Sequence, residues 1–210
     1  MPLSDRDYMR NSPPRWESGG YRVSRGLSFG ISPVLIIIAV NLLIFLIIVI
    51  FSQLVYGLGL SPTTFLGRPW TLVTSMFVHA GFGHIFGNML TLFFFGTYLT
   101  RLVGNNKFLF VYLVGGILGN ILYLLLAPPL SIAVGASGAV YAVAGVLAMM
   151  KPKLKVFLYF FIPMPLWVVV LVFFVIWSFF PGVAWQAHLG GLALGLTAGY
   201  FFRKRERSFF

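Results

Sequence analysis

Gly135-Ala136-Ser137-Gly138 opens an apolar run that extends to Met150 and is followed by Lys151. Membrane helices use small residues to pack closely against one another, so the commoner interpretation of Ser137 is a packing residue. The other interpretation is a nucleophile, because the N-terminus of a helix offers backbone N–H groups and a dipole that favour an anion. The four residues alone do not separate these interpretations, so the other polar residues have to be considered.

The composition is that of a polytopic membrane protein. Of the 210 residues, 59% are hydrophobic and 9% are charged, whereas a soluble domain carries about 25% charged residues. The chain has no cysteine, which excludes disulfides, thiolate nucleophiles and cysteine-ligated metal sites.

Carboxylate side chains are confined to the two ends of the sequence. The four acidic residues are Asp5, Asp7, Glu17 and Glu206. Residues 18–205 therefore cannot supply a Ser-His-Asp triad, a paired-aspartate protease site, an H-E-x-x-H zinc site or a carboxylate proton relay.

Six apolar runs, each bounded by Gly, Pro or basic residues, predict six transmembrane helices. They cover about 34–56, 85–102, 108–126, 136–150, 156–180 and 185–202. The fourth run is shorter than the ~20 residues that cross the hydrocarbon, so one of its ends must be buried in protein or reached by water. The loop 57–83 is rich in Gly, Pro and aromatic residues and is expected at the membrane interface. The fold class predicted is an all-α polytopic membrane protein with a long, membrane-associated first outer loop.

The basic residues predict the orientation of these spans. If six spans alternate, every Lys and Arg except Arg68 falls on one side of the membrane, and the positive-inside rule makes that side the cytoplasm. We expect a cytoplasmic tail at 1–30, a six-span membrane domain at 31–202 and a basic cytoplasmic tail at 203–210. Topology explains the net charge of +11 without a nucleic-acid partner, and the tails are expected to attract anionic lipid. In the absence of an organelle signal, a prokaryotic plasma membrane is the expected location, with a mitochondrial or Golgi membrane as the alternative.

Polar residues from three predicted spans lie at one depth. Counted back from the basic residue that ends each span, Asn88, Ser137 and His188 stand 13, 14 and 15 residues away. At ~1.5 Å per helical residue, each lies ~20–22 Å above that inner end, or ~8–10 Å below the outer surface of a ~30 Å hydrocarbon layer. His84, four residues before Asn88, shares its helix face. Ordinary interhelical hydrogen bonding explains each residue singly, but a common depth indicates a functional site.

These residue types can hydrolyse a peptide bond. His188, with a reference pKa near 6.5, can take the proton of Ser137 and return it to a leaving amine. Because no carboxylate is available, the pair would act as a dyad. His84 and Asn88 can add donors to an oxyanion site beside Ser137.

A ridge of small residues favours close packing of the sixth span against the fourth. Ala187, Gly191, Gly195 and Gly199 recur every four residues along the sixth span, and such a ridge lets another helix backbone approach. Gly138 makes the start of the fourth span similarly slender. Ordinary helix packing explains the ridge as well, so the ridge is compatible with a Ser137–His188 hydrogen bond without requiring one.

Three motifs carry the candidate residues. They are HAGFGHIFGN at 79–88, GASG at 135–138 with Tyr141 one turn further on, and AHLGG at 187–191. In combination they resemble the rhomboid intramembrane serine proteases, and the six apolar runs extend the resemblance to most of the chain.

The resemblance implies a role for each candidate residue. Ser137 corresponds to the nucleophile and His188 to the general base. His84 and Asn88 correspond to the oxyanion donors, and Tyr141 to a ring that packs on His188. The supporting residues are Gly135, Gly138, Gly191 and His79, of which His79 is the one expected to be structural.

The resemblance also implies the substrates: transmembrane segments of other membrane proteins, cut within the lipid bilayer near its outer face, with no metal, cofactor or ATP. The fifth span and the loop before His188 would be the mobile elements. The sequence departs from the common pattern at two positions of the loop anchorage. Thr71 follows Trp70 where many members have Arg, and Thr100 stands where an acidic residue is frequent.

Two other function classes remain as alternatives. A catalytically silent rhomboid-like protein that binds or escorts membrane clients is the first, although inactive relatives usually lose the serine or the histidine. A channel or transporter is the second, and it ranks last because no charged residue lies in the middle of a span.

Overall fold

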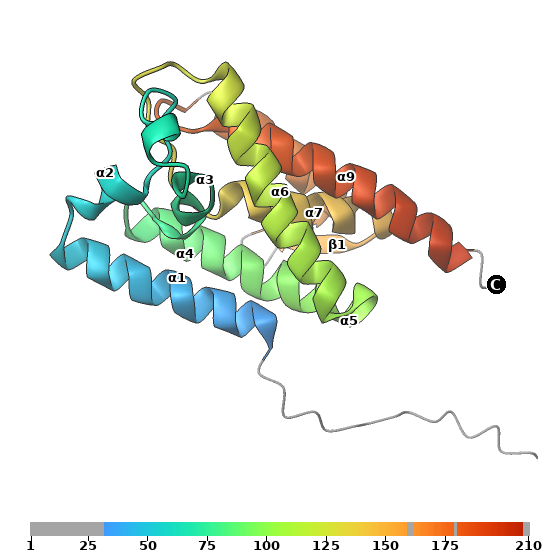
Figure 1. Ribbon diagram of the computed structural model, residues 1–210. Coiled ribbons are helices and arrows are strands. Elements are labelled where there is room, and N and C mark those ends of the chain that lie inside the picture. The colour runs from blue at the N-terminus through green and yellow to red at the C-terminus, as the bar shows by residue number, and fades with distance from the viewer. Residues whose placement is uncertain (1–31, 159–161, 179, 208–210) are drawn as a thin grey trace, which may run out of the picture. The chain divides into compact units, whose positions relative to one another are not determined.

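The structure is a computed structural model that describes residues 32–158, 162–178 and 180–207 (Figure 1). As predicted, this part of the chain is mostly helical. The α-helices are α1 (Pro33–Ile50), α2 (Leu54–Leu58), α3 (Thr71–Thr74), α4 (Phe82–Thr91), α5 (Thr97–Val103), α6 (Asn105–Leu126), α7 (Ser137–Met150), α8 (Leu166–Ser178) and α9 (Trp185–Arg207). The remaining elements are two 3-10 turns, η3 (Phe65–Gly67) and η4 (Ser75–Phe77), the π-helical segment η5 (Leu92–Gly96), and the strands β1 (Lys155–Leu158) and β2 (Ile162–Pro165).

Two of the described helices, α1 and α6, are long and apolar enough to cross a membrane. A third candidate is the pair of segments Thr71–Phe77 and Phe82–Val103, which are bent by 91° at the break between them. α7 and α8 are shorter apolar helices. Polar side chains and glycines lower the hydropathy of α9. The described residues thus contain two or three candidate spans, and the six-span arrangement stays a prediction.

The first and fifth predicted runs are wrong as single helices. α1 ends at Ile50, and α2 begins only after the turn at 51–53. In the fifth run, β1 and β2 pair antiparallel, with Val156 opposite Met164 and Phe157 opposite Pro163. Helix α8 starts only at Leu166, because Pro163 and Pro165 lack the N–H groups that a helix interior needs.

The predicted tails fall mainly outside the described residues, which begin at residue 32 and end at residue 207. α9 runs to Arg207, so the helix continues into the predicted C-terminal tail, which was expected to begin at residue 203.

Helices α6, α7 and α9 pack side by side, with α7 in the middle of the bundle (Figure 1). Small residues allow this packing: a Cβ on Gly195 would overlap the carbonyl oxygen of Ala142, and one on Gly199 would lie 2.8 Å from the carbonyl oxygen of Val146. α7 is buried along most of its length, and Val143 and Val146 are fully inaccessible. Burial inside the bundle explains how an apolar helix of 14 residues is accommodated.

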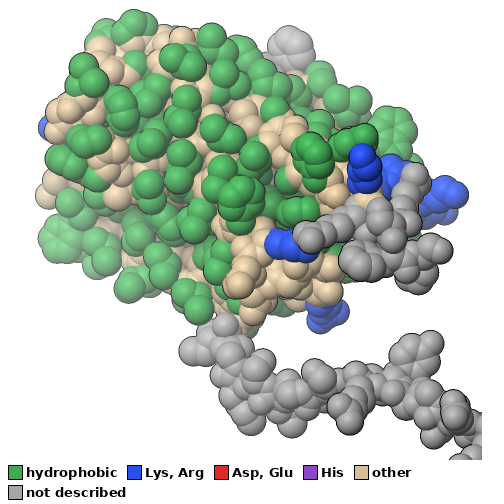
Figure 2. Space-filling model, turned by 45° about the vertical axis from the view of Figure 1, so that its right-hand side comes forward, with side chains coloured by type: hydrophobic (Ala, Val, Ile, Leu, Met, Phe, Trp, Pro, Cys, Tyr) green, Lys and Arg blue, Asp and Glu red, His purple; other side chains and the backbone are tan. Residues whose placement is uncertain are grey.

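The outer surface of the bundle is apolar. Large hydrophobic side chains are exposed along α1 and α6, among them Leu43, Val49 and Leu125. Hydrophobic side chains cover most of the face shown in Figure 2. An apolar surface of this extent is what a bilayer would cover.

Side-chain hydrogen bonds hold the loop 57–83 in place. Three of its residues donate to carbonyl oxygens in or beside α2: Arg68 to Tyr56 at 2.6 Å, Trp70 to Gly57 at 3.0 Å and Thr74 to Leu58 at 2.8 Å. Leu60 and Ala133 pair as an isolated antiparallel bridge. The bridge ties the loop to the segment that precedes Ser137.

At the two positions that depart from the rhomboid pattern, each threonine hydroxyl has a hydrogen-bond acceptor in its own segment of the chain. Thr71 is buried, and its hydroxyl donates to the carbonyl oxygen of Arg68 at 2.6 Å. The hydroxyl of Thr100 donates to the carbonyl oxygen of Thr97 at 2.9 Å. Neither threonine therefore lacks a hydrogen-bond partner.

Candidate active site

Ser137 is the first residue of α7, and a backbone turn at Gly135 brings the chain to it. Gly135 has φ +122°, a conformation that residues with a Cβ rarely adopt. A Cβ at this position would also lie 2.6 Å from Cε1 of His84. Glycine therefore permits both the turn and the close approach of His84 to the start of α7.

His188 of α9 reaches Ser137 directly. Its Nε2 lies 2.8 Å from Oγ of Ser137, within hydrogen-bond distance. His188 is buried, whereas Ser137 is half-buried. A Cβ on Gly191 would overlap the carbonyl oxygen of Gly138, so the backbones of α7 and α9 approach closely one turn beyond this pair.

Aromatic rings hold the other side of His188. The ring centroids of Tyr141 and His188 are 4.6 Å apart, with 31° between the ring planes. Phe174 of α8 meets Tyr141 edge to face, with centroids 6.0 Å apart. Three helices thus contribute to the position of the imidazole.

The Tyr141 ring is expected to matter more than its hydroxyl. In the serine-protease reaction that the resemblance implies, Tyr141→Phe keeps the ring and should cleave substrate at close to the wild-type rate. Tyr141→Ala should lower the rate about three- to tenfold, because an aromatic pair contributes ~0.5–1.5 kcal/mol. Initial cleavage rates of the purified variants provide the measurement. Equal losses in both variants would show that the hydroxyl, rather than the packing, is what His188 needs.

His84 lies beside Gly135, just before Ser137, and Asn88 follows His84 one turn further along α4. The side-chain amide of Asn88 donates to the carbonyl oxygen of His84 at 2.8 Å, within their own helix. In the described part of the chain, no hydrogen bond joins either side chain to Ser137. Of the two side chains, that of His84 is the one shown to reach the segment that precedes α7.

His79 lies in the break between η4 and α4, and it contacts both sides of the site. Its ring meets that of His84 edge to face at 5.1 Å. The backbone N–H of Ala136 points at its Nε2 at 3.4 Å. Burial, with a smaller contribution from His84, lowers the pKa of His79 to about 4. The ring is therefore neutral near pH 7, and its Nε2 is able to accept the hydrogen bond.

Sequence reasoning missed Asn120, which links α6 to the loop 57–83. Its amide donates to the carbonyl oxygen of Leu72 at 2.8 Å and to the hydroxyl of Ser75 at 3.0 Å. The carbonyl oxygen of Ser75 in turn accepts from the N–H of Gly135 at 2.8 Å. The sequence did contain a signal for this role, because Asn120 is a polar residue in the middle of an apolar run. In the structure its side chain is buried.

We expect Asn120→Ala to lower the free energy of unfolding by about 1–3 kcal/mol, because the buried Ser75 hydroxyl and the partly buried Leu72 carbonyl lose their partner. Denaturant titration in micelles measures the change. Asn106→Ala, an exposed substitution in the same helix, should leave the free energy of unfolding nearly unchanged. Equal stability of the two variants would contradict a structural role for the Asn120 bonds.

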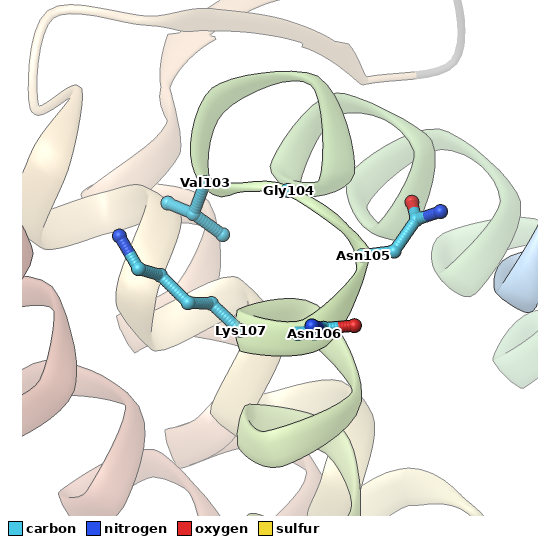
Figure 3. A pocket seen from close by; sticks show the side chains of 5 residues that line it. All are labelled: Val103, Gly104, Asn105, Asn106 and Lys107. Atoms are coloured by element: carbon cyan, nitrogen blue, oxygen red, sulfur yellow. The ribbon is translucent and has the colours of Figure 1, made fainter.

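The described residues contain no group of three or more His, Cys, Asp or Glu side chains that could hold a metal ion. An open depression is lined by Val103, Gly104, Asn105, Asn106 and Lys107 at the turn between α5 and α6 (Figure 3). None of the predicted site residues lines it.

Fold and site together define a helical membrane protein in which a serine and a histidine are hydrogen-bonded between two helices. Residues 66–205 match the Rhomboid domain. This match covers more than half of the chain, and the chain belongs to the rhomboid family.

Relatives of the chain occur in eukaryotes and in bacteria. It is 33% identical over 162 residues to RHOMBOID-like protein 12, mitochondrial, of Arabidopsis thaliana, covering 66% of this chain and 48% of that protein. Over 154 residues it is 31% identical to Rhomboid protein 1, mitochondrial, of Saccharomyces cerevisiae, covering 64% of this chain and 42% of that protein. Over 81 residues it is 38% identical to Rhomboid protease GluP of Bacillus subtilis, covering 39% of this chain and 16% of that protein.

The matched parts span less than half the length of each of these relatives. Two of the three are named as mitochondrial. The comparisons thus support a membrane protein of the rhomboid family, but they do not support the expected prokaryotic plasma membrane.

Proposed function

We propose that the chain is an intramembrane serine endopeptidase that cleaves peptide bonds in or near the transmembrane segments of other membrane proteins. The observation that carries the proposal is the 2.8 Å contact between Ser137 Oγ and His188 Nε2. Membership of a family that includes a named rhomboid protease also supports it.

In the proposed reaction, His188 takes the proton from the Ser137 hydroxyl while Oγ attacks the carbonyl carbon of the scissile bond. The C–N bond then breaks, and the imidazolium donates its proton to the leaving amine. A water molecule repeats the sequence on the acyl-enzyme, which releases the new carboxyl end and restores the serine. Water is the only co-reactant.

The negative charge that develops on the carbonyl oxygen needs donors. Backbone N–H groups at the start of an α-helix lack intrahelical partners, so the N-terminus of α7 offers donors beside Ser137. His84 and the second N–H of the Asn88 amide are the side-chain donors in this proposal. In a studied protease, one such donor lowers the activation barrier by about 3 kcal/mol.

The proposal places this site in a six-span domain at 31–202, with residues 1–30 and 203–210 cytoplasmic. Alternation of the spans then opens the site ~8–10 Å below the outer surface. Half-burial of Ser137 beside a buried His188 supports a nucleophile that a substrate backbone can reach.

Cleavage of a model substrate in liposomes tests the proposal. The reporter is a single-span protein with small residues and a helix breaker near the outer face. The wild-type protein should cut it, and Ser137→Ala should not. Equal cleavage by both proteins would contradict the proposal, and absence of cleavage by well-folded wild type would favour the client-binding alternative.

A further inference from the structure

Basic side chains gather at one end of the bundle, from three parts of the sequence: the α5–α6 turn, the segment after α7 and the end of α9. We call them the basic cluster, and its members are Arg101, Lys107, Lys151, Lys153, Lys155, Arg203 and Lys204. Figure 2 shows Lys and Arg side chains grouped in this way, beside a surface that is mostly hydrophobic.

Packing brings these three parts together. The ammonium group of Lys107 lies 5.3 Å from the ring centroid of Phe202, which joins the α5–α6 turn to α9. The guanidinium group of Arg203 donates to the carbonyl oxygen of Met149 at 3.4 Å, which joins α9 to the end of α7. Leu154 packs against the same hydrophobic core. The cluster is therefore built into the fold.

The described side chains, at 32–157, 162–176 and 180–204, include no Asp or Glu. Five members of the cluster are exposed: Arg101, Lys107, Lys153, Lys155 and Lys204. A concentration of one charge raises the local concentration of the opposite charge. The surface thus fits an anionic partner.

Apolar side chains beside the cluster indicate where that partner lies. Phe157 of β1 is 60% exposed, and Phe201 of α9 is 61% exposed. Exposed aromatic rings next to long basic side chains are typical of the boundary between hydrocarbon and headgroups. A water-soluble polyanion would leave these rings uncovered, whereas a phospholipid supplies both the phosphate and the acyl chain.

We infer that the basic cluster binds the headgroup phosphates of anionic phospholipids in the adjacent leaflet. The depression at the α5–α6 turn offers room for one headgroup (Figure 3). In Figure 3 the Lys107 side chain extends to one side of the turn and the Asn105 side chain to the other, and an ammonium and an amide can each donate to phosphate oxygens. The inference does not depend on catalysis by Ser137.

Native mass spectrometry of the purified full chain tests the inference, with phosphatidylglycerol and phosphatidylcholine of identical acyl chains as probes. Wild type should bind phosphatidylglycerol in preference. The preference is the ratio of the affinities for the two lipids. In the variant Lys107→Gln/Lys153→Gln/Lys155→Gln, this ratio should fall about fivefold for each lysine removed. Arg68→Gln, which removes the basic residue of the outer loop, should keep the wild-type preference.

Three results would overturn the inference: an unchanged preference in the triple variant, an equal loss in Arg68→Gln, or displacement of the lipid by inorganic phosphate at the same concentration. If the triple variant does not fold, as judged by its thermal unfolding, Lys153→Gln alone provides the comparison. A wild-type preference in that folded single variant would likewise contradict the inference.

Discussion

Replacing His188 with alanine is expected to reduce cleavage about 10⁴-fold or more, to the level of Ser137→Ala. The reason is the 2.8 Å contact through which the imidazole takes the serine proton. Because the two side chains act as one unit, the double variant should be no less active than either single variant. Single-turnover cleavage of the reporter in liposomes measures all three.

Thr197→Ala is the control for this series. Thr197 lies on the exposed face of the same helix, and its hydroxyl bonds only the carbonyl oxygen of Ala193 one turn back among its described contacts. Its replacement should leave cleavage unchanged. Independent, multiplicative losses from Ser137→Ala and His188→Ala would contradict a dyad, since they would mean that each residue acts without the other.

Gly191→Ala is expected to have the second largest effect, although Gly191 touches neither reacting atom. Its new Cβ would overlap the carbonyl oxygen of Gly138, so α9 must move away from α7. A displacement of about 1 Å in a reacting pair costs about 100-fold in rate. We expect a loss of that order in the cleavage rate together with a lower unfolding temperature.

Gly87→Ala provides the matched control, because a Cβ on this glycine of α4 would meet no atom within 4 Å. This substitution should raise helix stability by about 0.5–1 kcal/mol and leave cleavage unchanged. Wild-type activity in Gly191→Ala would show that the Ser137–His188 contact does not depend on the close approach of the two helices.

The proximity of Ser137 to His188 was predictable from sequence because α7 and α9 are regular helices with a constant rise per residue, whereas their depth in the bilayer stays a prediction. Counting residues from the basic end of a helix then gives the height of a side chain along the helix axis. Small residues indicate which helices pack closely against each other. The prediction brought the two residues to one level, and the structure joins them by a hydrogen bond.

Side-chain direction was not predictable in the same way. Asn88 stands at the expected end of its helix, but η5 separates it from Arg101, and a π-helical segment alters the residue count per turn. Its amide donates to the carbonyl oxygen of His84 rather than toward Ser137. Depth alone contains no information on this local alternative partner.

Apolar composition does not distinguish a strand from a helix, so the fifth run was predicted as a single span. The alternating prolines, Pro163 and Pro165, were the available signal for the hairpin that precedes α8. Asn120 was missed for a different reason. Its partners belong to an irregular loop, whose backbone path no periodic pattern specifies.

The most direct test of the central claim treats the purified protein with a small fluorophosphonate and locates the adduct by mass spectrometry. An activated serine should give an adduct on Ser137 in wild type, and His188→Ala should give none. Failure of Ser137 to label in well-folded wild type, under conditions in which a known serine protease labels in the same detergent, would contradict the proposed activity.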